Sequence, residues 1–235
     1  MNIKSVIITV LFLSAFSSSA FAQQLNARGF PTLPSSSGSA KSLGIRGSAG
    51  AGFTDFVVVN PPDTFKMDRG TYLAAQIERG FNFAHLYFTV TLSQMNAEGT
   101  ANYNFTDLSA SQTYTAKNLR FTASLLDLSL GFKLKIIDDY WFRPYIEGGG
   151  VGSYYQIKYD NNSTLDAQGS WKKTDVMMGS GGYGEAGIEV AFSDFFGLKF
   201  AARYSDQQSK DLVTQNNERL KLRSETYYLS AMVGF

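Results

Sequence analysis

The sequence predicts an all-β chain in which eight antiparallel up-and-down strands close into a transmembrane β-barrel. Apolar and polar residues alternate with a period of two in eight separate segments, as they do on the two faces of a strand. The connections between these segments are alternately long and short, and aromatic residues gather at the short ones. The last segment ends on the aromatic residue Phe235. Lipid outside the barrel and an aromatic girdle at each interface would explain all three features.

The start of the chain is predicted to be removed or flexible. Residues 1–22 read as a secretory signal peptide, with Lys4 at the positive end, a short apolar core and a small-x-small cleavage site that ends at Ala22. Residues 23–42 are rich in Ser, Gly and Pro, which favours a flexible leader. The barrel domain is therefore expected to span residues 43–235.

The charge balance and the absence of cysteine narrow the possible partners. The chain has 21 Lys and Arg against 20 Asp and Glu, and Lys4 is the only charge in the signal peptide. A neutral mature chain without a basic run argues against nucleic acid as a partner. With no Cys there is no disulfide and no N-terminal lipid attachment through cysteine. After the signal peptide, no apolar run is long enough for a membrane-spanning helix.

The first four strands are predicted at Leu43–Phe56, Thr71–Arg79, Ala84–Met95 and Leu119–Leu134. Each has an apolar face that is expected to meet lipid and a mixed or polar face that is expected to line the lumen. The lipid-facing residues in chain order are Ile45, Ala49, Ala51 and Phe53, then Leu73, Ala75 and Ile77, then Leu86, Phe88, Val90 and Leu92, and finally Leu126, Leu128, Leu130 and Phe132.

The last four strands are predicted at Phe142–Ile157, Val176–Phe192, Gly197–Ser205 and Leu222–Phe235. In the fifth strand the apolar phase changes after Gly148-Gly149-Gly150, so that Val151, Tyr155 and Ile157 follow it on the apolar face. Because glycine in a strand often marks an extra residue, we expect a β-bulge at this run.

The connections orient the barrel. Long connections are predicted near residues 57–68, 96–118, 158–175 and 206–221, and short ones near 80–83, 135–141 and 193–196. An even strand number then places both termini at the short turns, which face the periplasm in bacterial outer-membrane barrels. One predicted girdle lies at this end and consists of Phe81, Phe83, Tyr140, Trp141, Phe142, Phe195, Phe196 and Phe235. A looser band near the long loops consists of Phe53, Phe56, Tyr72, Tyr154, Tyr155, Tyr204 and Tyr227.

A secreted soluble barrel or sandwich is the alternative, since eight up-and-down strands also occur in soluble ligand carriers. Such a protein would bury the apolar stripes inside. Charges on the polar face far from any loop, the two aromatic levels and the terminal Phe235 weigh against it.

Nine charged residues on the polar stripes are predicted to form a lumen charge cluster: Arg46, Glu78, Asp127, Lys133, Glu147, Glu185, Glu189, Lys199 and Arg203. An eight-stranded barrel has room inside only for side chains or one small ligand. Because an unpaired buried charge costs several kcal/mol, these charges should pair. We expect a salt-bridged plug, and the alternative is a polar gate or narrow pore.

Catalysis and metal binding find little support in the sequence. His85 is the only histidine, and its phase predicts a lumen-facing, hydrogen-bonded filler near a periplasmic turn. A metal site would need further ligands, and a hydrolase would need a nucleophile within reach of a base. We therefore expect no enzyme activity, no metal and no cofactor.

Two segments resemble those of a known family. Phe142-Arg143-Pro144-Tyr145-Ile146, with the glycines and Tyr154-Tyr155 that follow, is similar to the fifth strand of the outer membrane protein W family, and Gly184–Glu189 is similar to the strand after its third long loop. The resemblance implies a small eight-stranded barrel of a Gram-negative outer membrane that passes small apolar solutes or ions through a narrow lumen.

The resemblance also implies a role for the last strand. In this class of barrel a terminal aromatic strand is recognised by the outer-membrane assembly machinery. The corresponding outward residues here are Tyr227, Leu229, Ala231, Val233 and Phe235. Expected partners are this machinery, outer-membrane lipid and lipopolysaccharide, and the barrel is expected to be a monomer.

Three functions remain in order of preference. The first is a structural or surface-interaction protein whose loops contact envelope components or other surfaces, since binding residues concentrate on loops held by a rigid scaffold. The second is a porin-like narrow channel for small apolar solutes or ions. The third is an envelope enzyme.

Overall fold

The structure is a computed structural model that describes residues 44–59, 66–81, 85–107, 112–137, 141–162, 173–193, 195–211 and 219–234. The predicted signal peptide and leader lie outside these residues, as do Phe83, Tyr140 and Phe235. Within the described ranges, no helix is long and apolar enough to cross a bilayer.

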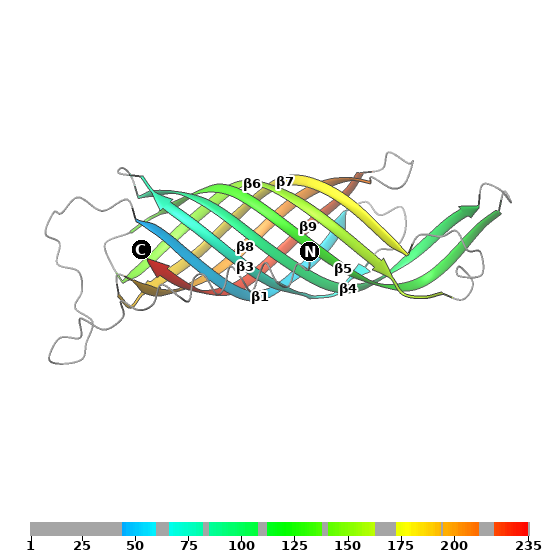
Figure 1. Cartoon of the computed structure of the whole chain (residues 1–235), viewed down its shortest axis with the longest axis horizontal. Helices are drawn as coiled ribbons and strands as arrows, with labels where there is room; N and C mark the ends of the chain where they lie inside the picture. Colours follow the sequence, from blue (N-terminus) through cyan, green and yellow to red (C-terminus); the bar gives the residue numbers. More distant parts are fainter. Residues whose placement is uncertain are drawn as a thin grey trace, which may run out of the picture.

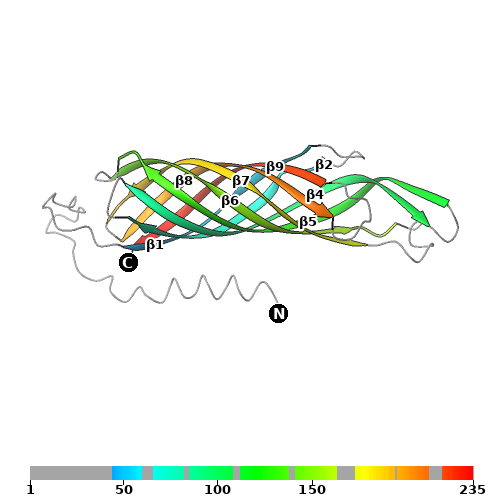
Figure 2. The same ribbon diagram turned by 90° about the horizontal axis from the view of Figure 1, so that it is seen from above.

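Eight strands form one closed antiparallel barrel (Figures 1 and 2), which confirms the predicted fold class. They are β1 (Ile45–Val59), β3 (Gly70–Gly80), β4 (Leu86–Asp107), β5 (Gln112–Lys135), β6 (Phe142–Tyr159), β7 (Thr174–Ala191), β8 (Phe196–Asp211) and β9 (Arg219–Gly234). Consecutive strands are neighbours, and β1 pairs with β9 to close the ring. The two-residue strand β2 (Lys66–Met67) pairs with the upper part of β4.

Strands β4 and β5 are longer than predicted, so the expected long connection at 96–118 is wrong. The two strands stay paired from Leu86 with Leu134 to Asp107 with Gln112, with one register shift between Ala101 and Tyr103. The resulting hairpin projects beyond the end of the barrel (Figures 1 and 2). β8 likewise continues to Asp211. Beyond the level of the lipid, two strands can stay paired through their backbones without alternating apolar and polar residues. The apolar alternation therefore stops before the strand does, and the predicted bounds of β4, β5 and β8 are too short.

The expected bulge at Gly148–Gly150 is also wrong. β6 keeps one continuous register with β5 and with β7 across all three glycines. Val151, Tyr155 and Ile157 are buried and share the inward phase of Tyr145. The apolar pattern changes because the outer half of the lumen is itself apolar, not because the strand gains a residue.

Close packing of the wall accounts for the central glycine of the run. Gly149 pairs with Gly131 on β5. A Cβ on Gly149 would lie 2.1 Å from the carbonyl oxygen of Leu130 and 2.6 Å from the Cα of Gly131. Gly150, by contrast, faces outward, and its nearest neighbour would be 3.9 Å away. Only the inward glycine is therefore required by a close approach of backbone.

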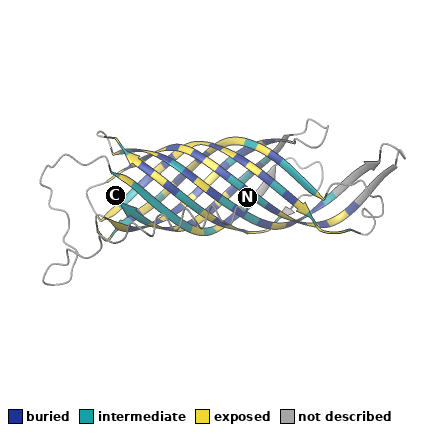
Figure 3. Ribbon diagram, viewed as in Figure 1, coloured by how far each residue is buried: buried dark blue, intermediate teal, exposed yellow. Residues whose placement is uncertain are grey.

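Buried and exposed residues alternate along most of the strands (Figure 3), whereas residues 46–50 of β1 are all half-buried. The exposed face is apolar at mid-height, with Leu73, Ile77, Leu92, Leu128, Leu130, Ile146, Ile188, Phe200 and Leu229. At the short turns the exposed rings of the predicted girdle are Phe81, Trp141, Phe142, Phe195 and Phe196. At the long-loop end Phe53, Tyr154, Tyr204 and Tyr227 face outward.

Three members of the predicted looser band near the long loops are not part of an outward-facing girdle. Phe56, Tyr72 and Tyr155 are buried in the lumen. They lie on the inward phase of their strands, where they pack with Met95, Leu125, Met177 and other residues in an apolar layer. The position of each residue along its strand predicts its level along the barrel axis. Whether the side chain points into the lumen or toward the lipid depends on the alternation of residues within the strand.

The packing of the two neighbouring glycines gives a matched pair of variants. Gly149→Ala should lower the free energy of unfolding by about 1–3 kcal/mol, because its Cβ forces backbone apart. Gly150→Ala should change it by less than about 0.5 kcal/mol. Denaturant titration of the refolded barrel in detergent measures both, and equal stability of the two variants would contradict the assigned faces.

Candidate functional site

The lumen charge cluster forms a nearly continuous ionic filling in the half of the barrel nearer the short turns. Of the nine predicted residues, all except the half-buried Arg46 are buried. They come from β1 and from β3 and β5 to β8, because each strand turns every second side chain into the bore. The structure adds one further buried cation, Lys135 on β5.

Four residues make a closed set of ion pairs at the lower end of the cluster. Lys133 Nζ lies 2.5 Å from Glu78 Oε2 and 2.9 Å from Glu189 Oε1. Lys135 Nζ lies 3.0 Å from Glu78 Oε1 and 2.8 Å from Glu189 Oε2. Arg46 lies 3.7 Å from Glu78 at the open edge. Each lysine thus bridges both carboxylates, which offsets the cost of removing these charges from water.

Gln76 on β3 links this set to the rest of the lumen. Its Nε2 donates to both oxygens of Glu147 on β6, at 3.0 and 3.1 Å, and to Thr91. Its Oε1 accepts from Lys199 on β8 at 2.9 Å and from Lys133 on β5 at 3.3 Å. One amide on β3 is therefore in contact with side chains from four other strands, β4, β5, β6 and β8.

Tyrosines fill the space between the charges. Tyr145 and Tyr228 each donate to Glu185 at 2.7 Å, and Tyr183 donates to Glu147 at 2.8 Å. Glu185 also pairs with Lys199 at 3.3 Å. The same rings face cations, with Lys133 4.6 Å from the ring centre of Tyr145 and Lys199 4.9 Å from that of Tyr228. Such contacts stabilise a cation where water is excluded.

Asp127 and Arg203 lie on the long-loop side of this filling and differ from the other charged residues in their partners. Among the described residues neither is in an ion pair, although the sequence predicts that every lumen charge is paired. Arg203 stacks 3.8 Å from the ring centre of Tyr183 and donates to Ser129. Asp127 accepts from Gln207 at 3.1 Å. Neutral polar groups thus replace the expected countercharges.

An apolar layer fills the lumen at the long-loop end. It contains Phe56, Met95, Phe121, Leu125, Ile157, Met177 and Leu222, all buried. The lumen is therefore ionic near the short turns, polar in the middle and apolar near the long loops. The sequence predicts the ionic part only, because the apolar layer has the same composition as the lipid-facing stripe.

Two residues of the cluster were missed for identifiable reasons. Lys135 is two residues after Lys133 on the same face, but the predicted strand ended at Leu134. Gln76 carries no charge, although it lies two residues before Glu78 on the same face. His85 lies at the β3–β4 turn, as predicted, but it is exposed and has a φ of 50°, so the prediction that it fills the lumen is wrong. A turn there breaks the strand phase from which its direction was inferred.

The predicted assembly segment lies on the outer wall of β9. Tyr227, Leu229 and Ala231 are exposed, Val233 is partly exposed, and Phe235 lies outside the described residues. In the described part of the chain no three acidic or histidine side chains form a group that would hold a metal ion.

Comparison with known proteins shows likeness in structure but not in sequence. No protein-family model matches the chain, and no curated protein matches it. The outer membrane protein OprG of Pseudomonas aeruginosa has a similar structure, with a TM-score of 0.51 and 14% identity over 82% of this chain and 94% of that one. Neisserial surface protein A (NspA) gives a TM-score of 0.48 and 14% identity over 81% and 97% of the two chains. A major outer membrane protein of Thermus thermophilus gives a TM-score of 0.45 and 13% identity over 82% and 98%.

The likeness to OprG shows that the fold is that of the small eight-stranded outer-membrane β-barrels. At this identity it shows the fold alone. The fold implied by the sequence resemblance is therefore confirmed.

Lys133 is the residue whose loss should cost the fold most. Lys133→Met leaves Glu78 and Glu189 with only Lys135 between them, and removing one partner of a buried pair costs about 3–5 kcal/mol. The exposed Lys158 on β6 is the matched control, and Lys158→Met should change stability by less than about 0.5 kcal/mol. The measurement is the free energy of unfolding in detergent, and equal losses would contradict a structural role for the ion pairs.

Proposed function

We propose that this chain is an integral protein of a bacterial outer membrane, with its lumen closed by the ionic filling and a structural or surface-interaction role at its long-loop end. The observation that carries the closed lumen is the Gln76 amide, which is in hydrogen-bond contact with side chains from β5, β6 and β8 at once. A solute on the barrel axis would have to break these contacts.

Two observations support the membrane. The outer wall exposes a continuous apolar surface between aromatic levels, which water would not tolerate over such an area. The fold is shared with OprG, a protein of a bacterial outer membrane. In the proposed orientation the short turns and both termini face the periplasm. Lipid, lipopolysaccharide and the assembly machinery are then its partners, and the barrel acts as a monomer without enzyme activity.

The β4–β5 hairpin supports a surface role. It extends beyond the barrel end at which β6 and β8 end (Figure 1). A rigid scaffold that holds a projecting hairpin is a common way to present a binding surface.

A narrow channel for small apolar solutes or ions is the second candidate, and the apolar layer favours it. An apolar solute could leave water among Phe56, Met95 and Leu125 at the long-loop end of the lumen. It would then meet the Gln76 contacts, which would have to open for passage.

Electrical recordings separate the two candidates. Planar bilayers loaded with the wild-type barrel should show no conductance steps if the lumen is closed. Gln76→Ala should produce steps, because it removes the group that joins Glu147 to Lys199. Gln208→Ala, which changes an exposed glutamine on the outer face of β8, should stay silent. Steps from the wild type would favour the channel.

The terminal residue gives a test of the proposed location. Deletion of Phe235 should lower the fraction of barrel that reaches the outer membrane in folded form, because the assembly machinery would lose the terminal ring. Phe235→Tyr keeps an aromatic ring and should assemble normally. Folded protein is measured by its shifted gel migration without boiling, and normal assembly of the deletion would contradict the assigned role.

A further inference from the structure

Unpartnered polar side chains of the lumen gather between the ionic filling and the apolar layer. Among the described residues, five buried side-chain atoms make no hydrogen bond. One of them, Glu189 Oε2, lies 2.8 Å from Lys135 Nζ and is held by that ion pair. The other four belong to residues that are at most 5% exposed, here called the middle layer: Tyr72 OH, Ser93 Oγ, Asp127 Oδ1 and Arg203 Nη1.

The strand register places three members of the middle layer side by side. Ser93 on β4 is the direct cross-strand partner of Asp127 on β5. Tyr72 on β3 is paired with Met95, which is two residues from Ser93 on the same inward face of β4. Side chains in direct and diagonal positions on one face of a sheet are neighbours. Two hydroxyl groups and a carboxylate oxygen therefore line one side of the bore.

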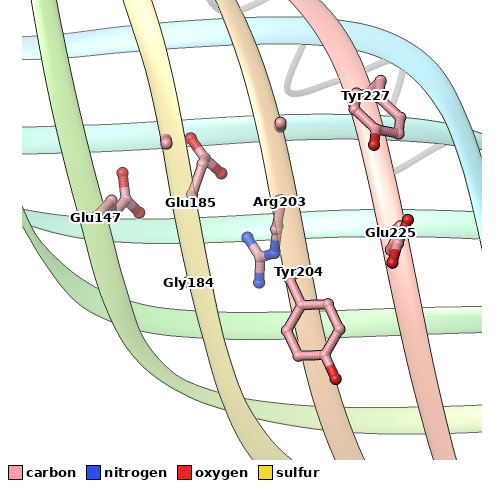
Figure 4. A pocket seen from close by; sticks show the side chains of 9 residues that line it. Glu147, Gly184, Glu185, Arg203, Tyr204, Glu225 and Tyr227 are labelled. Atoms are coloured by element: carbon pink, nitrogen blue, oxygen red, sulfur yellow. The ribbon is translucent and has the colours of Figure 1, made fainter.

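The fourth member, Arg203, reaches this side from β8. It lies next to Glu185, its cross-strand partner on β7 (Figure 4). Its Nη2 donates to Ser129 on β5, two residues from Asp127 on the same face. Arg203 acts electrostatically on both Asp127 and Tyr72, but it makes no ion pair with Asp127, so their charged atoms are more than 4.0 Å apart. The two opposite charges are thus separated by a gap too wide for a direct hydrogen bond.

The chemistry of the middle layer defines what can bridge this gap. A buried polar group without a partner is costly, and a charged one more so. A bridging group has to accept a hydrogen bond from Arg203 Nη1 and donate one to Asp127 Oδ1. One positive and one negative group leave the layer without net charge, so it favours neither a metal cation nor an inorganic anion. Water meets both demands, and a buried water commonly makes about three hydrogen bonds to such groups.

We propose that a cluster of bound water molecules fills the middle layer and joins Asp127 to Arg203, with Tyr72 and Ser93 as further partners. The contacts of Gln76 close the lumen on the short-turn side of these waters, and the apolar layer closes it on the long-loop side. The waters are therefore enclosed and exchange slowly with bulk water. This slow exchange rests on the proposed closed lumen, whereas the presence of the waters rests only on the four unpartnered groups.

A crystal structure of the refolded barrel, at a resolution that shows ordered water, tests for the cluster. Density is expected within hydrogen-bond distance of both Arg203 Nη1 and Asp127 Oδ1. A direct ion pair between Asp127 and Arg203, or the lack of ordered density between them, would overturn the proposal. This measurement needs no variant, so it stands even if a substitution in the lumen prevents folding.

Magnetic relaxation dispersion of the water signal tests the enclosure in detergent solution. The wild type should show waters that stay bound for longer than the tumbling time of the protein. Asp127→Leu combined with Arg203→Met places apolar side chains in the middle layer and should abolish this contribution, whereas the exposed Lys158→Met should retain it. Shifted gel migration without boiling is confirmed first for every sample, so that only folded barrels are compared.

The two measurements separate failure of the water site from failure of the closed lumen. Gln76→Ala should shorten the residence time of the waters, because it removes the contacts on the short-turn side. Water density in the crystal together with fast exchange in the wild type would support the site and contradict the closed lumen. Long-lived waters that persist unchanged in the folded Asp127→Leu, Arg203→Met double variant would place them elsewhere and overturn the proposal.

Discussion

In a bilayer, the backbone N–H and C=O groups of every strand must find partners within the protein, and this requirement shapes the rest of the molecule. The ladder between β1 and β9 meets it by removing the last two free edges. Closure with eight strands then fixes a bore that only side chains can fill. The wall accordingly has two apolar environments and one polar one: lipid outside, the apolar layer near the long loops, and the ionic filling near the short turns.

In the ionic filling, the buried polar side chains likewise find their partners within the protein. Each lower lysine contacts two carboxylates, Gln76 joins opposite walls, and tyrosines donate to the carboxylate oxygens that remain. With Lys135 added, the lumen charge cluster comprises five cations and five acids, so its formal sum is zero. Glycine at position 131 leaves the room that the ring of Tyr183 needs, since a Cβ there would meet the Tyr183 hydroxyl.

The outward face was predictable because lipid favours an apolar side chain at every outward position. An apolar residue at every second position of a strand therefore identifies this face. The lumen imposes different demands at different heights. Val151, Tyr155 and Ile157 therefore looked like lipid-facing residues, although they line the apolar layer. The contacts across the bore were beyond prediction, since they depend on the stagger between strands. No spacing in the sequence indicates that Gln76 meets Lys199.

In β7 and β8, the side chains on the inward face explain why the outward face can carry small residues. Glu185 and Arg203 are buried behind the outward Gly184, Ala186 and Ala202, and they are held by Tyr228, Ser129 and Tyr183. Because these inward contacts hold the strands in place, the outward positions need no large side chain for stability. The contacts of the ionic filling in β7 and β8 thus come from inward side chains, whereas the outward positions of Gly184, Ala186 and Ala202 hold only small residues.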